Sequence, residues 1–174
     1  MAVSALMAGC STINSTPYKA STTNVIAVQQ SLGAQGKKVS LGNMTLATGV
    51  EESPLCRMLG PVKVSPGKSP PQYIRDAFQE ELFMAQVYQP NAASVIETRL
   101  DGLSFSSVTP ASWSIGLTVS SNASKGYAVS VKYPFDTSFG ALQACQNVAD
   151  AFGPAVQELL KQVVMHPEFS KLAK

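Results

Sequence analysis

The sequence has little of what common active sites are built from. His166 is the only histidine among 174 residues, which excludes a multi-histidine metal site and leaves catalysis by imidazole with one candidate, next to a helix-stopping proline. There is no Gly-rich phosphate loop, no Cys-x-x-Cys pair and no zinc-type spacing. We therefore predict no catalytic residue, no metal and no cofactor, and expect that the protein is not an enzyme.

Charge and long apolar runs are also scarce. Only 14% of residues are charged and the formal net charge is +2, too weak a field to indicate nucleic acid as a partner. No run approaches the roughly 18 to 20 consecutive apolar residues of a membrane-spanning helix. The 45% hydrophobic content suffices for a core, and the length indicates one domain, which we place at residues 38–174.

The N-terminal residues carry a motif. Small and apolar residues lead into Leu6-Met7-Ala8-Gly9-Cys10, which resembles the lipobox of bacterial lipoproteins. The resemblance implies a signal peptide over residues 1–9 and a diacylglycerol on Cys10. The apolar run is short and no Lys or Arg precedes it, as expected if the signal peptide is truncated or the start codon is assigned too far downstream. Ser11 after the cysteine is similar to the pattern of outer-membrane lipoproteins, so the domain is expected to face the periplasm.

Residues 10–37 join this motif to the domain. They are rich in Ser, Thr, Asn, Gln and Gly, a composition that buries too little apolar surface to offset the entropy of ordering. We predict a flexible tether that begins at the lipidated Cys10. Val25 to Val28 is an apolar exception, and a short strand there is the alternative.

Alternation of side chains predicts the sheet. Apolar residues occupy every second position from Trp113 to Val119 and again from Tyr127 to Phe135, on either side of a polar turn. Ser94 to Ser107 alternates with a change of phase at Asp101-Gly102, which indicates a β-bulge. A weaker strand signal covers Val39 to Leu46.

Two segments have helical periodicity. Ser69-Pro70-Pro71 opens the first, which Gln89-Pro90-Asn91 ends, and we place the adjacent Glu80 and Glu81 on its solvated face. The second runs from Ser138 to Val164 with an apolar stripe that includes Leu142, and Pro154 should kink or break it. The fold class is thus α+β: a small, mainly antiparallel sheet in the order strand, helix, three-stranded meander, helix, with both helices on one face.

Three cysteines divide as one plus two. If Cys10 carries lipid, Cys56 and Cys145 remain as an even pair in an oxidising compartment. We predict a disulfide between them; a reduced, buried Cys145 is the alternative. The bond would pin the proline-rich connection from Glu51 to Pro71 to the C-terminal helix.

The polar face of the hairpin is the predicted partner surface. Helices on one face leave the other face for solvent or for a partner. Small outward side chains keep that face flat and leave an edge strand open to pairing. The residues that we assign to it are Ser112, Ser114, Thr118, Ser130 and Lys132.

The element order, the bend at Asp101-Gly102-Leu103 and the closing amphipathic helix, behind the lipobox and tether, resemble the small periplasm-facing lipoproteins of the YajG type. The likeness extends more distantly to the auxiliary lipoproteins of ABC-type envelope transporters. It implies a non-catalytic envelope protein. Together with the lipobox and the uncovered sheet face, this leads us to expect a lipid-anchored binding or adaptor module with an envelope protein as its partner. The alternatives are a carrier of lipid or another small ligand that serves envelope transport, and, less favoured, an enzyme that acts on peptidoglycan.

Overall fold

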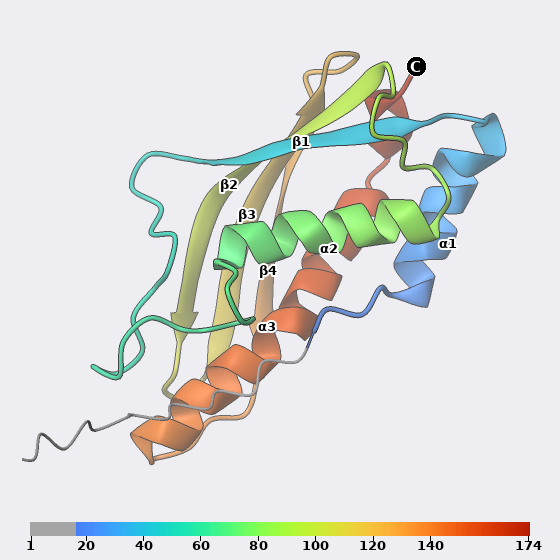
Figure 1. Cartoon of the computed structure of the whole chain (residues 1–174). Helices are drawn as coiled ribbons and strands as arrows, with labels where there is room; N and C mark the ends of the chain where they lie inside the picture. The colour runs from blue at the N-terminus through green and yellow to red at the C-terminus, as the bar shows by residue number, and fades with distance from the viewer. Residues whose placement is uncertain (1–16) are drawn as a thin grey trace, which may run out of the picture.

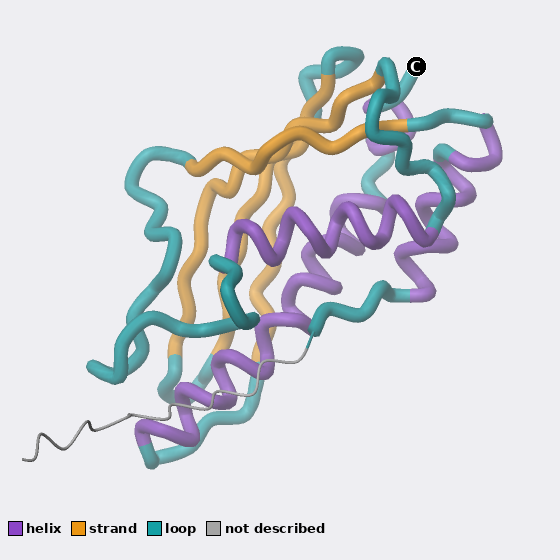
Figure 2. Tube along the Cα trace, viewed as in Figure 1, coloured by secondary structure: helices purple, strands orange, loops and turns teal. Residues whose placement is uncertain are grey.

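The computed structural model describes residues 17–174. Four strands form one sheet in the order β1-β2-β3-β4, with β1 parallel to β2 and the remaining neighbours antiparallel. All of the helices lie on one side of this twisted sheet (Figures 1 and 2). The predicted α+β class is confirmed. The elements are α1 (Thr22–Ser31), η1 (Gly33–Gln35), β1 (Val39–Leu46), α2 (Pro70–Met84), β2 (Ser94–Ser106), β3 (Ser112–Ser121), β4 (Tyr127–Pro134), α3 (Ala141–Val164) and η2 (Phe169–Leu172).

The meander has the predicted register. On β3, Leu117 stands between Leu100 of β2 and Val129 of β4. Pairing shifts between Leu100 and Gly102, which is the expected bulge and keeps Leu103 on the buried face. The turn before β4 requires glycine, because a Cβ on Gly126 would lie 1.7 Å from the Val119 carbonyl oxygen.

A second bulge divides β1. The pairing with β2 shifts between Leu41 and Met44, and the backbone carbonyls at this point turn toward α2. Arg75 donates to the Gly42 carbonyl at 3.1 Å and to the Leu41 carbonyl at 3.4 Å. The guanidinium of α2 thus satisfies acceptors that the irregular pairing leaves open.

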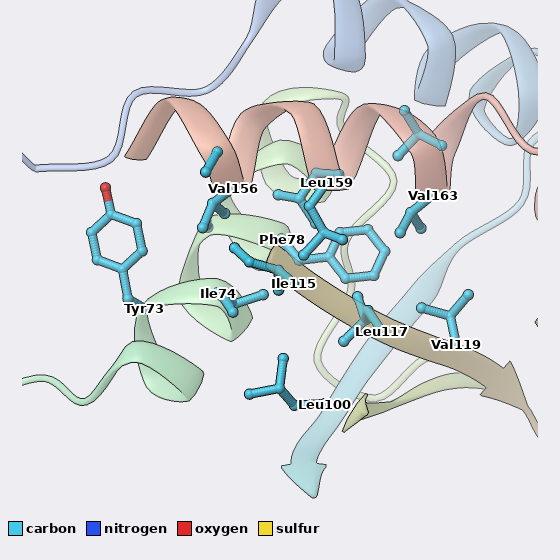
Figure 3. Packing of buried hydrophobic residues seen from close by; sticks show 14 of the residues in the cluster. Tyr73, Ile74, Phe78, Leu100, Ile115, Leu117, Val119, Val156, Leu159 and Val163 are labelled. Carbon is cyan, nitrogen blue, oxygen red and sulfur yellow. The ribbon is translucent and has the colours of Figure 1, made fainter. Parts of the chain in front are cut away.

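The core lies between the helices and the sheet. Trp113 is fully buried, packs at 4.8 Å between ring centroids against Phe152 of α3, and donates its indole N–H to the Val148 carbonyl at 2.8 Å. Figure 3 shows side chains of α2, α3 and the strands meeting in this layer. Among the labelled residues are Ile74, Phe78, Leu100, Ile115, Leu117, Val119, Val156, Leu159 and Val163.

Helix α2 begins where the sequence indicated. The Ser69 N–H donates to the Gln72 side-chain oxygen at 3.1 Å, and Pro70 and Pro71 occupy the first turn. The helix ends at Met84, short of the predicted stop at Gln89, because Gln86 adopts a left-handed φ of 60°. The chain then turns back toward β1, where the Val39 N–H donates to the Val87 carbonyl.

Helix α3 runs 24 residues without a break. We predicted a break or kink at Pro154, but this residue lies on the exposed side of the helix, where water can hydrogen-bond the freed carbonyl. Leu142 was assigned to the buried stripe and is 76% exposed, because the first turn of α3 projects beyond the sheet (Figure 1). The predicted stop at Met165-His166-Pro167 and the short turn after it are confirmed.

The tether prediction is wrong for the described part of residues 10–37. Thr22–Ser31 forms helix α1, where we expected a flexible chain or a strand at Val25 to Val28. The helix packs against α2 and α3, and the residues that it and the following turn bury are spaced by four: Asn24, Val28 and Leu32. Tertiary contacts therefore order a segment whose composition alone does not favour folding.

Candidate functional site

The uncovered face of the sheet carries most of the predicted partner surface. Ser130 and Lys132 are exposed on β4, and Ser114 and Thr118 are half-buried on β3. β4 is the last strand of the sheet and pairs only with β3, so its outer backbone edge has no strand neighbour. A flat face of small polar side chains beside an edge strand is suited to the addition of a partner strand.

Ser112 is not exposed on this face, contrary to our prediction, because its exposed fraction is only 6%. It lies at the end of β3, where it pairs with Pro134 of β4. The pairing continues past the strand, since the Phe135 N–H donates to the Ala111 carbonyl at 3.1 Å, and the Thr137 hydroxyl then donates to the Ser107 carbonyl. Sequence alternation assigns a residue to one side of the sheet, but it does not reveal how far that residue is buried.

A short polar chain fixes the centre of the uncovered face. Asp101, at the bulge of β2, accepts a hydrogen bond from the Thr118 hydroxyl and forms an ion pair with Arg99 at 2.7 Å. Beside it, Gly116 and Gly102 are paired across the strands. The middle of the face is therefore flat, and its polar groups are partly satisfied by one another.

A second surface lies at the end of the molecule where α3 begins (Figure 1). Cys56 and Cys145 form a disulfide with their Cα atoms 5.9 Å apart. The bond joins the proline-rich connection to the second turn of α3. Residue 56 is thereby held beside the loop that precedes this helix.

Arg57 ties the same loops together. Its guanidinium donates to the Ser107 hydroxyl at 2.9 Å, to the Ser107 carbonyl, and to the Phe139 carbonyl at 3.1 Å. Three segments far apart in the sequence thus meet around one side chain. A hollow of about 300 Å³ lies between them, lined by Arg57, Val108, Thr109, Thr137, Ser138 and Phe139.

The loops hold apolar side chains in solvent. Arg57 and Met58 both have positive φ, 43° and 62°, a conformation that costs free energy for residues other than glycine. The turn is closed by hydrogen bonds between the backbones of Cys56, Leu59 and Gly60, and it leaves Met58 fully exposed. We call the whole cluster the apolar tip; it consists of Leu55, Met58, Leu59, Val108, Phe139 and Leu142, each more than half exposed.

A third feature is a buried carboxylate. Glu81 is fully buried, so its placement on the solvated face of α2 was wrong. Its Oε1 accepts hydrogen bonds from the Tyr18 hydroxyl, from the Ser21 N–H at 2.9 Å and from the Asn24 amide at 3.2 Å. Burial raises the pKa of the Glu81 carboxyl above its ordinary value, and these three donors lower it again only in part.

The Glu81 cluster joins the start of the described chain to both long helices. Asn24 also donates to the Gln157 carbonyl of α3 at 3.1 Å. The Gln157 side-chain amide in turn donates to the Lys19 carbonyl at 2.6 Å. Tyr18 packs edge-on against Tyr73, whose pKa burial raises to about 12. These hydrogen bonds hold α1 and the residues before it against α2 and α3.

The single histidine has a structural position. His166 stacks on Tyr127 with ring centroids 3.8 Å apart, and its Nδ1 accepts a hydrogen bond from the Glu168 N–H. Tyr127 in turn donates to the Val163 carbonyl at 2.7 Å. Within residues 17–174, no group of His, Cys, Asp and Glu side chains is arranged to hold a metal ion.

The predicted lipidation site lies outside the described residues. Cys10 and the signal peptide assigned to residues 1–9 precede Pro17, so their prediction stands untested by the structure. Among the helices of residues 17–174, none has both the length and the apolar character to cross a bilayer.

Comparison with known proteins gives little. No family model and no curated protein matches the chain. A crystal structure of a DUF330 protein from Xanthomonas campestris is similar at 11% identity with a TM-score of 0.47, covering 74% of this chain and 81% of that one. A second solved structure, of an uncharacterized protein, has 7% identity and a TM-score of 0.42 over 73% and 92%. The resemblance to YajG-type lipoproteins therefore stays a prediction.

Proposed function

We propose that this protein is a non-catalytic lipoprotein of the bacterial outer membrane that binds an envelope protein in the periplasm. Lipid on Cys10 would anchor it, and residues 17–174 would form the binding module. The resemblance of Leu6 to Cys10 to a lipobox supports the anchor. The observation that carries the binding role is the sheet face without helices, beside the unpaired edge of β4.

A ligand carrier is the less favoured alternative. It would need a cavity between the helices and the sheet, and large buried side chains occupy that layer: Phe78 from α2, Trp113 from β3 and Phe152 from α3. The polar residues of the uncovered face, by contrast, contact solvent and need no rearrangement to meet a partner.

Site-specific photo-crosslinking tests the binding role. A photoreactive amino acid at Ser130 stands on the uncovered face, whereas the same group at Gln162 stands on the outer side of α3, and both positions are exposed. In native envelopes we expect a discrete crosslinked species from the Ser130 probe and a much weaker one, or none, from the Gln162 probe. Equal patterns at both positions would place the partner elsewhere.

The anchor is tested separately. Intact mass and membrane fractionation should show a diacylglycerol on Cys10 of the precursor, and a Cys10→Ser variant should fractionate as soluble periplasmic protein. If that variant still sediments with the outer membrane as strongly as the parent chain, the lipid is not the anchor.

A further inference from the structure

We infer that the apolar tip contacts the lipid bilayer and inserts its side chains among the phospholipid headgroups. The inference extends the proposed function, since it takes the lipid on Cys10 as the primary anchor. The observation behind it is that Met58 and Phe139, 81 positions apart in the sequence, are both fully exposed on loops that Arg57 joins through its hydrogen bond to the Phe139 carbonyl.

The exposure and composition of the tip fit a lipid surface. Its side chains project from three loops, around a disulfide and the Arg57 guanidinium. Soluble proteins seldom expose so many large apolar side chains together without a binding role. Met, Leu, Val and Phe are suited to shallow burial at the boundary between headgroups and acyl chains.

Charge also fits a phospholipid surface. Segments 53–60, 106–111 and 137–142, which form the tip, contain a single charged residue, the cationic Arg57. The nearest acidic residues along the chain, Glu52 and Asp136, directly precede two of these segments. A cation among apolar side chains complements the negative surface of a membrane that contains anionic lipid.

The covalent reach from Cys10 permits this contact. Lys19 is fastened to Gln157 of α3, and the nine residues from Cys10 to Lys19 can span at most about 30 Å. From Gln157 back to Leu142, at the tip, α3 covers about 22 Å. A lipid on Cys10 can therefore lie in the same membrane that the tip touches, and the short connection keeps the domain close to that surface.

Tryptophan quenching by brominated lipid tests the contact in the lipidated full-length chain. Phe139→Trp places a fluorophore at the tip, and Phe83→Trp places one at an equally apolar position, 66% exposed on α2 and outside the tip. Trp113 is buried and gives the same background in both. In vesicles of brominated phosphatidylcholine and phosphatidylglycerol, we expect quenching of the Phe139→Trp signal at least about twice that of Phe83→Trp.

Vesicle flotation of the full chain with Cys10→Ser gives a second measurement, independent of the lipid anchor. Replacing Met58 and Phe139 by Ser should lower the bound fraction about tenfold, because burial of their apolar side chains is lost. The matched pair Phe83→Ser and Met84→Ser should change it less than about twofold.

The outcomes separate the two proposals. If the lipidated chain binds vesicles but its Phe139→Trp signal is quenched no more than that of Phe83→Trp, the inference is overturned and the anchor stands. A tip that is covered by a protein, and not by lipid, would give the same result. A Cys10 without lipid, together with a tip that still binds vesicles, overturns the anchor and supports the inference.

Discussion

Two peripheral segments are held against the long helices by different chemistry. α1 and the residues before it are held by hydrogen bonds to the buried Glu81 of α2 and to Gln157 of α3. At the start of α3, the proline-rich connection is held by the bond from Cys56 to Cys145 and by Arg57. The first fastening depends on burial and protonation, and the second depends on oxidation.

The two kinds of contact hold segments that differ in how far they are buried. The Glu81 cluster completes the core, since α1 covers α2 and α3 and buries Val28 and Leu32. The disulfide lies next to the turn that exposes Met58 and Leu59, while Val62 and Val64 of the same connection are buried in the core. The bond therefore holds in place an exposed apolar turn that burial of its own side chains does not stabilise, which is consistent with a binding role for the tip.

Loss of the disulfide should have the largest effect on stability. The bond closes a loop of 89 positions, for which the chain-entropy model gives about 4 to 5 kcal/mol of free energy of unfolding. We expect the double variant Cys56→Ala and Cys145→Ala to lose about this amount in urea unfolding. Reducing agent should lower the parent chain similarly and leave the variant unchanged. A loss below about 1 kcal/mol would show that Arg57 alone holds the loop.

Removal of Glu81 should have a smaller effect that depends on pH. Glu81→Ala leaves the donors of Tyr18, Ser21 and Asn24 without their acceptor, which costs about 1 to 3 kcal/mol. Glu81→Gln keeps one acceptor oxygen and cannot titrate, so it is the control for charge.

The sign of the pH dependence follows from the raised pKa. The folded state holds the Glu81 proton more tightly than the unfolded state does. The stability that this proton contributes is fully present below the unfolded pKa of about 4.3, and it is lost as pH rises through the folded pKa. The parent chain should therefore lose stability relative to Glu81→Gln as pH rises above the unfolded pKa. A relative gain with rising pH would mean that the charged carboxylate is the favoured form.

The sequence was most informative where side chains meet a regular surface. Alternation in Trp113 to Phe135 predicted the hairpin and its buried face, and the phase change at Asp101-Gly102 predicted the bulge, because a pleated strand imposes a period of two. The capping residues at Ser69 predicted the start of α2. These features depend on local geometry and on one buried face.

The sequence was least informative about the contacts that hold α1 and the exposed loops in place. Glu81 lies on the same helical stripe as Ile74, Ala77, Phe78 and Ala85, and this periodicity could have identified it as buried; its charge and the neighbouring Glu80 argued otherwise. α1 gave no such signal, because Asn24 occupies the first of its buried positions and its partners lie far away in the sequence. The apolar tip joins three loops, and no periodicity connects them.

The smallest expected effect is that of Tyr18→Phe, which removes one donor from the Glu81 cluster and keeps the aromatic ring against Tyr73. The hydroxyl stabilises the charged carboxylate, so its loss should raise the pKa of Glu81 further. We expect a cost of about 0.5 to 1.5 kcal/mol, larger at alkaline than at acidic pH. In a Glu81→Gln background, where the amide oxygen still accepts a hydrogen bond but cannot titrate, this pH dependence should disappear. Tyr133→Phe, on β4, is the matched control and should show no such pH dependence. Equal losses for Tyr18→Phe at both pH values would mean that packing, and not the bond to Glu81, holds the N-terminal segment against α2.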